Sequence, residues 1–182
     1  MFLDLNWQHT NYQKDIWPFL QNGIVIDTSV LKIIIDGVIS SRISKKESPE
    51  LDNLLKFLDY IKIGNKWDKF YITPHILTET CNHLRNDYSK YITFKNIVEE
   101  ILPIIKEINE KIVEKDRLME LINKDKPIVE IGDLSIFVIT NDFIKKNQKV
   151  AILVKDRGIT KKYENDPNVM IMEYFSIINN QF

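Results

Sequence analysis

Short apolar runs alternate along the chain with longer segments whose apolar residues recur every three or four positions. The short runs are rich in Ile, Val and aromatic residues, which are typical of buried strands. They predict strands at 24–26, 70–72, 150–154 and 169–172. The first of these runs stops at an acid, Asp27, and the third is followed within two residues by Asp156.

The segments between these runs have the spacing of amphipathic helices. They predict helices at 29–39, 49–63, from Pro74 onward, at 94–122, 132–147 and 159–164. Thr73 and Pro74 form a strong helix start, because Thr caps an exposed amide and Pro fits the first helical position. Pro103 predicts a kink or a break in the helical stretch around it. The alternation predicts an α/β fold with a parallel central sheet sandwiched by helices.

The length of 182 residues and the apolar content of 44% predict one domain with a substantial core. We expect residues 1–22 to form an arm packed on the body, and 23–182 to form a single domain with a long helical insertion at about 94–124. Apolar runs are far shorter than the roughly 20 residues of a membrane span, so no membrane association is expected. One cysteine, Cys81, cannot form an internal disulfide, which favours a cytoplasmic location.

With 25 Lys and Arg against 26 Asp and Glu, the chain carries no general basic coat, so candidate chemistry must be local. Four carboxylates stand where strands end or helices begin: Asp27, Glu79, Asp133 and Asp156. Ligands of open α/β sheets bind beyond the carboxyl ends of the strands, so we expect these acids to gather there. Carboxylates from separate elements are the ligands that Mg²⁺ prefers, and a bound ion can activate water for phosphodiester hydrolysis.

Each of these features also has a simpler interpretation. Asp27 or Asp133 alone could cap a helix, because an acid near a helix N-terminus stabilises its free amides. His75, Glu79 and His83 share one helix face and could form a transition-metal stripe, or the histidines could flank the site or be solvated. It is the occurrence of all four acids in order that favours a metal site over separate caps.

The segments around the four acids resemble those of the PIN (PilT N-terminus) domain nucleases. The matching runs are Val25-Ile26-Asp27-Thr28-Ser29, Thr73-Pro74-His75-Ile76-Leu77-Thr78-Glu79, Gly132-Asp133-Leu134-Ser135 and Asp156-Arg157-Gly158-Ile159. The resemblance implies a three-layer fold like that of the 5′-nucleases. It also implies an endonuclease that depends on Mg²⁺ or Mn²⁺, usually cuts RNA, and leaves a 5′-phosphate and a 3′-hydroxyl.

Carried over position by position, the resemblance assigns Asp27, Glu79, Asp133 and Asp156 as the catalytic and metal-binding acids. It assigns Ser29, with Thr28 beside it, as support for the first acid. Many small bacterial members of the family are toxins held by an antitoxin. An RNA substrate, an antitoxin protein and a second copy of the chain are therefore the expected partners. The chain departs from the family in carrying Val154 where Thr or Ser is common, and in its longer 94–124 segment.

Lysines gather around Asp156, and of these basic residues Lys155 and Arg157 are the candidates for contacts to a nucleic-acid backbone. Three alternatives stay open. The chain could act on DNA, or it could be a noncatalytic module that keeps the fold and binds a partner. It could also be a phosphohydrolase with Asp27 as a covalent nucleophile, although such enzymes need a second acid where this chain has Ser29.

Overall fold

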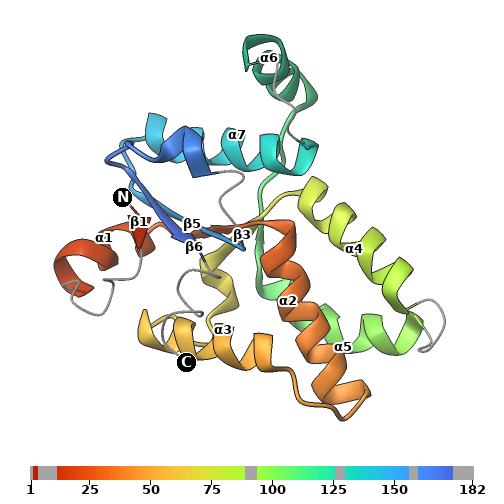
Figure 1. Ribbon diagram of the computed structural model, residues 1–182. Coiled ribbons are helices and arrows are strands. Elements are labelled where there is room, and N and C mark those ends of the chain that lie inside the picture. The colour runs from red at the N-terminus through yellow and green to blue at the C-terminus, as the bar shows by residue number, and fades with distance from the viewer. Residues whose placement is uncertain (1, 4–11, 89–93, 126–129, 156–159, 174–182) are drawn as a thin grey trace.

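A six-stranded sheet, parallel throughout, forms the centre of the computed structural model (Figure 1). The structure describes residues 2–3, 12–88, 94–125, 130–155 and 160–173. The strand order is β1-β6-β5-β2-β3-β4. The strands are β1 (Phe2–Leu3), β2 (Ile24–Ile26), β3 (Phe70–Ile72), β4 (Asn109–Glu110), β5 (Val150–Val154) and β6 (Val169–Glu173).

Helices cover both faces of this sheet, with α7 on one side and α3 on the other (Figure 1). The α-helices are α1 (Trp17–Leu20), α2 (Thr28–Val38), α3 (Pro49–Tyr60), α4 (Pro74–Tyr88), α5 (Phe94–Glu107), α6 (Lys115–Asp125) and α7 (Ile131–Lys145). Short helical turns are η2 (Tyr12–Ile16), η3 (Ile39–Ile43), η4 (Trp67–Lys69) and η5 (Thr160–Tyr163). The predicted α/β class, with a parallel sheet between helices, is confirmed.

The central strands are apolar, apart from Glu173 at the end of β6, because both faces of the sheet are covered. Every residue of β2, β5 and β6 is buried. This explains why these strands read as continuous apolar runs rather than alternating ones. Gly23, just before β2, has a φ of +111°, and a Cβ there would lie 2.2 Å from Cε2 of Tyr71, so only glycine fits this turn.

The four predicted strands are present, but the sequence did not predict the two short strands β1 and β4. Strand β4 lies inside the segment that was expected to be helical throughout. It pairs with β3 through Tyr71 and Asn109, and the backbone amide of Lys111 donates to the carbonyl of Ile72 at 2.9 Å. Helix α5 is not broken at Pro103 but continues to Glu107. The segment is therefore two helices flanking an edge strand.

Helix α6 stands away from the sheet and is attached through α7 (Figure 1). The guanidinium of Arg117 donates two hydrogen bonds to the carboxylate of Asp142, at 2.8 and 2.5 Å. The hydrogen bonds from Arg117 lower the pKa of Asp142, and the same bonds raise the pKa of Arg117. A bidentate ion pair of this kind fixes the relative orientation of the two side chains as well as the distance between them.

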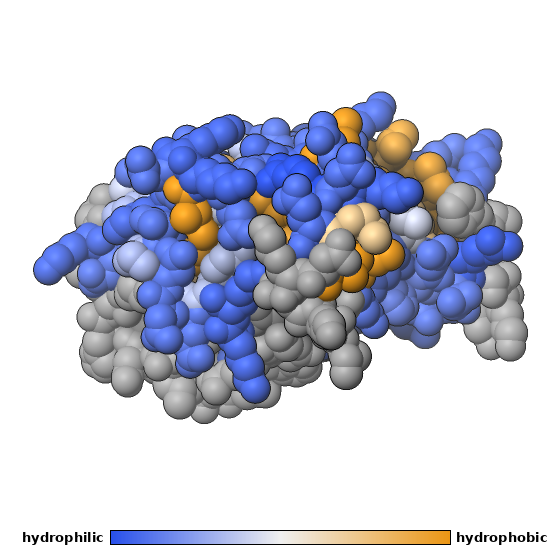
Figure 2. Space-filling view, turned by 90° about the horizontal axis from the view of Figure 1, so that it is seen from above, coloured by the Kyte–Doolittle hydropathy of each residue, from blue (hydrophilic) through white to orange (hydrophobic). Residues whose placement is uncertain are grey.

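Seen from the side of α6 and α7, the surface is mostly hydrophilic, with several separate hydrophobic areas (Figure 2). Among the large apolar side chains, Ile112, Met119 and Ile131 are exposed, on or next to these two helices. Across the described part of the chain, no helix has the length and apolar character needed to cross a membrane.

Candidate functional site

Asp27 lies at the carboxyl edge of the sheet, directly after β2. Its side chain is 8% exposed. One carboxylate oxygen, Oδ1, accepts a hydrogen bond from the backbone amide of Val30 at 2.7 Å, and Oδ2 accepts one from the amide of Lys155 at 3.3 Å. Asp27 is thus the N-cap of α2 and also joins β2 to the end of β5. A carboxylate oxygen has two lone pairs, so a carboxylate that caps a helix can also bind a second group.

Glu79 reaches the same edge from α4. The hydroxyl of Thr28, the residue after Asp27, donates to Oε2 of Glu79 at 2.9 Å. A Cβ on Gly132 would lie 2.6 Å from the same Oε2 and 3.7 Å from the Thr28 hydroxyl oxygen. The Glu79 carboxylate therefore occupies the space that a side chain at 132 would fill. The first turns of α2 and α7 meet at Glu79.

A hydrogen bond between two buried hydroxyl groups connects the start of α4 to the start of α7. Ser135 donates to the carbonyl of Gly132 at 2.6 Å, and its oxygen lies 2.7 Å from that of Thr73. Since the Ser135 proton goes to Gly132, Thr73 must donate to Ser135. Thr73 also accepts from the amide of Ile76 at 3.3 Å and caps α4, as predicted. Thr73 and Ser135 are both fully buried, so the arrangement is shielded from water.

Asp133 follows Gly132 in the first turn of α7 and is partly exposed. The structure thus brings the chain positions of three predicted acids, Asp27, Glu79 and Asp133, to one edge through Thr28 and Gly132. The fourth acid, Asp156, and Arg157 lie outside the described residues, so their places stay predictions. Ser29 is half-buried in the first turn of α2, beside the capping contact of Asp27.

The metal prediction can be tested against the described side chains. Within them, no three His, Cys, Asp or Glu residues lie close enough together to hold a metal ion. The donor chemistry still fits Mg²⁺ or Mn²⁺, because the oxygens come from carboxylates on separate elements. The described residues supply part of the expected ligand set, and the position that would complete it, Asp156, follows directly on Lys155.

Glu173 is a further acid at this edge that was not predicted from the sequence. It ends β6, is paired in register with Val154, and is 8% exposed. Its signal was present in the sequence, because an apolar run ends at an acid there as it does at Asp27. A buried carboxylate thus lies next to the end of β5.

Basic and imidazole groups border the acids. The Lys155 ammonium lies 3.8 Å from a carboxylate oxygen of Glu50, in the first turn of α3. His83, one turn along α4, has its Nε2 3.9 Å from Oε1 of Glu79 and is about half exposed. Lys155, which was predicted to contact a nucleic-acid backbone, therefore lies at the acid edge and bridges toward α3.

A second charged cluster joins α2 to α4 further along both helices. Lys32 contacts Asp36 and lies 2.8 Å from Asp87, and the Tyr88 hydroxyl donates to Asp36 at 3.0 Å. Burial lowers the pKa of Lys32, but hydrogen bonds and attraction to Asp36 and Asp87 outweigh it and leave that pKa raised. Burial, with the nearby charge of Asp36, raises the pKa of Tyr88 to about 12. The cluster holds the helix that carries Glu79 against the helix that Asp27 caps.

Comparisons of the chain with protein-family models, with curated proteins and with solved structures found no match. The resemblance to PIN domain nucleases rests on the motifs around the four acids.

Proposed function

We propose that this protein is a metal-dependent endoribonuclease of the PIN type, with its active site at the carboxyl edge of the sheet. The main support for this proposal is one hydrogen bond between α2 and α4. The hydrogen bond from Thr28 to Glu79, beside Gly132, brings together the starts of α2 and α7 and the middle of α4. Each of these places holds or adjoins one of the predicted acids. Helix caps alone would not require Glu79, which lies within α4, to join them.

Asp27, Glu79, Asp133 and Asp156 are the residues that would hold the metal. When bound, Mg²⁺ or Mn²⁺ would supply activation of water and neutralisation of charge on the scissile phosphate. The protein's own groups do the positioning. Two backbone amides fix the carboxylate of Asp27, and Thr28 fixes that of Glu79. RNA as the substrate, and an antitoxin as a partner, follow from the family resemblance.

The test is cleavage of labelled single-stranded and structured RNA, with Mn²⁺, with Mg²⁺ and with chelator. Asp27→Asn is the decisive variant, because Asn retains an acceptor oxygen for the cap but loses the charge. We expect wild type to cut only with metal. Asp27→Asn should lose cutting while it stays folded, with a lower melting temperature because its NH2 group cannot accept from the amide of Lys155. Glu120→Gln, which removes one exposed charge on α6, is the matched control and should cut normally. A folded Asp27→Asn protein that cuts as well as wild type would refute the proposal.

A noncatalytic binding module with the same fold is the second candidate. It predicts no cleavage of any RNA or DNA in either metal, and no Mn²⁺ binding by the wild-type protein.

A further inference from the structure

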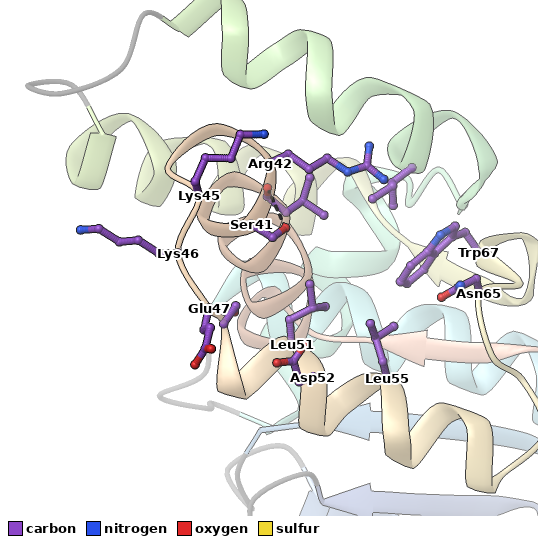
Figure 3. Close-up of a pocket in the computed structure, with 13 residues that line it drawn as sticks. Ser41, Arg42, Lys45, Lys46, Glu47, Leu51, Asp52, Leu55, Asn65 and Trp67 are labelled. Carbon is purple, nitrogen blue, oxygen red and sulfur yellow. Dashed lines mark hydrogen bonds between the residues drawn. The ribbon is translucent and has the colours of Figure 1, made fainter.

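A pocket of about 730 Å³ opens next to the end of α2 (Figure 3). Its walls come from η3, the loop after it, the first turns of α3, the region of Trp67, and α5. Asp27, Glu79 and Asp133, the predicted acids that the structure describes, are not among its lining residues. The proposed nuclease site therefore does not account for this pocket.

The lining of the pocket is divided between an apolar interior and a charged rim. Leu51 and Leu55 rise into it from α3, and Trp67 stands on the opposite side (Figure 3). Arg42 and Lys45 lie along the turn and loop that close the pocket on the α2 side. An aromatic face with cations around it is the combination that stacks a planar base and holds a phosphate.

Acidic groups at the pocket narrow the kind of ligand it fits. Glu47 and Asp52 also line it, and Arg42 lies 3.4 Å from Glu100 in an exposed ion pair. The lining thus holds three cations, Arg42, Lys45 and Lys46, and two carboxylates, so a polyanion alone would be a poor match. A nucleotide offers a flat base, amino and hydroxyl donors for the carboxylates, and one phosphate for the cations.

The pocket is within reach of the acid edge by two routes. Helix α2 begins at Thr28 and its last residue, Val38, lines the pocket. Its 11 residues span roughly 16 Å at the α-helical rise. The ion pair between Lys155 and Glu50 also joins the end of β5 to the first turn of α3, where Leu51 and Asp52 line the pocket. A single-stranded RNA bound across the acid edge would therefore reach the pocket within a few nucleotides of the scissile bond.

We propose that this pocket is a second nucleotide-binding site, which holds one nucleotide of the RNA substrate away from the scissile bond. The base lies against Trp67, and the phosphate lies at Arg42 and Lys45. That the bound RNA is also the substrate rests on the proposed function. Nucleotide binding at the pocket does not depend on cleavage. The test is therefore done without catalysis.

The experiment uses the full chain carrying Asp27→Asn, with chelator present. Tryptophan fluorescence is followed during titration with an eight-nucleotide RNA and, separately, with adenosine monophosphate. Arg42→Gln with Lys45→Gln removes two rim charges, and Lys115→Gln on α6 is the control for charge loss elsewhere. Trp67→Phe keeps an aromatic ring but removes the reporting indole. Thermal melts verify that each variant is folded.

We expect RNA to quench the fluorescence, and the double rim variant to bind about tenfold more weakly, as the loss of phosphate contacts predicts. Trp67→Phe should lose the quench, and Lys115→Gln should behave as the parent does.

Quenching by adenosine monophosphate as strong as that by RNA would overturn the substrate-strand proposal in favour of a free nucleotide ligand. No quench by either ligand, or a folded double rim variant that binds RNA like the parent, would overturn nucleotide binding at the pocket. RNA binding here without cleavage by wild type would refute the nuclease and leave the pocket in place.

Discussion

At the scale of single residues, the geometry of the candidate site depends on small and hydroxyl-bearing side chains as much as on acids. Thr28 orients the Glu79 carboxylate, and the missing side chain of Gly132 leaves room for it. The acids themselves could be predicted, because each stands at a strand end or helix start. The pairing of Thr28 with Glu79 could not, because it joins residues 51 positions apart and depends on how α2 and α4 pack.

Gly132→Ala should disturb the site without unfolding the protein. The new Cβ would displace the carboxylate of Glu79, the far end of a flexible side chain. Since alanine also favours a helix over glycine, the unfolding free energy should change by no more than about 1 kcal/mol. We expect RNA cleavage to fall at least as strongly as for Thr28→Val, measured beside urea denaturation.

Gly37→Ala supplies the contrast for that experiment. A Cβ on Gly37 would lie 2.4 Å from Cβ of Leu51, where α2 crosses α3, so a helix would have to move. This variant should lose about 1–3 kcal/mol of stability through overpacking. If Gly132→Ala were less stable than Gly37→Ala, the claim that the Glu79 side chain can move aside for the new Cβ would be wrong.

The buried hydroxyls of Thr73 and Ser135 should be energetically coupled. Ser135→Ala leaves the Thr73 hydroxyl without its acceptor inside the core, which costs about 1–3 kcal/mol. Thr73→Val removes the cap of α4 as well as the bond to Ser135. In a double-mutant cycle by urea denaturation, the two losses should be less than additive by about 1 kcal/mol. Additive losses would show that the two hydroxyls do not share a hydrogen bond that matters for stability.

At the scale of helices and strands, the sequence predicted buried elements well and edge elements poorly. Strands β2, β3, β5 and β6 could be predicted because their apolar residues are continuous. Strand β4, Asn109–Glu110, has no apolar pattern and exists through backbone pairing with β3. The turn η3 was missed for a related reason, since apolar spacing does not distinguish a π-helical turn from an α-helical end or a loop.

The link between α2 and α4 should weaken at high pH. The pKa of Tyr88 is raised to about 12 from an ordinary value of 10.0, so the folded state keeps a proton that the unfolded chain loses. This contribution to stability is complete below pH 10 and is lost as the pH rises toward 12. Between those values, wild type should lose stability more steeply than Tyr88→Phe in urea denaturation. Parallel curves for the two proteins would contradict the burial of the Tyr88 hydroxyl beside Asp36.

At the scale of the whole molecule, the parallel sheet explains why acids distant in sequence lie at one edge. Strands β2, β3 and β5 run in the same direction, so the residues after them emerge together. That much followed from the βαβ pattern. The pocket beside α3 could not be predicted from the sequence, because it depends on how η3, α3 and α5 cross and not on a local motif.

The most direct test of the central claim, that the acids at this edge form one metal site, is calorimetric titration of the full chain with Mn²⁺. We predict that wild type binds the ion and that Asp27→Asn and Glu79→Gln each weaken binding about tenfold or more, because each removes one charged ligand. Glu120→Gln should bind as wild type does. Wild type that shows no Mn²⁺ binding, or a folded Asp27→Asn protein that binds Mn²⁺ unchanged, would contradict the account.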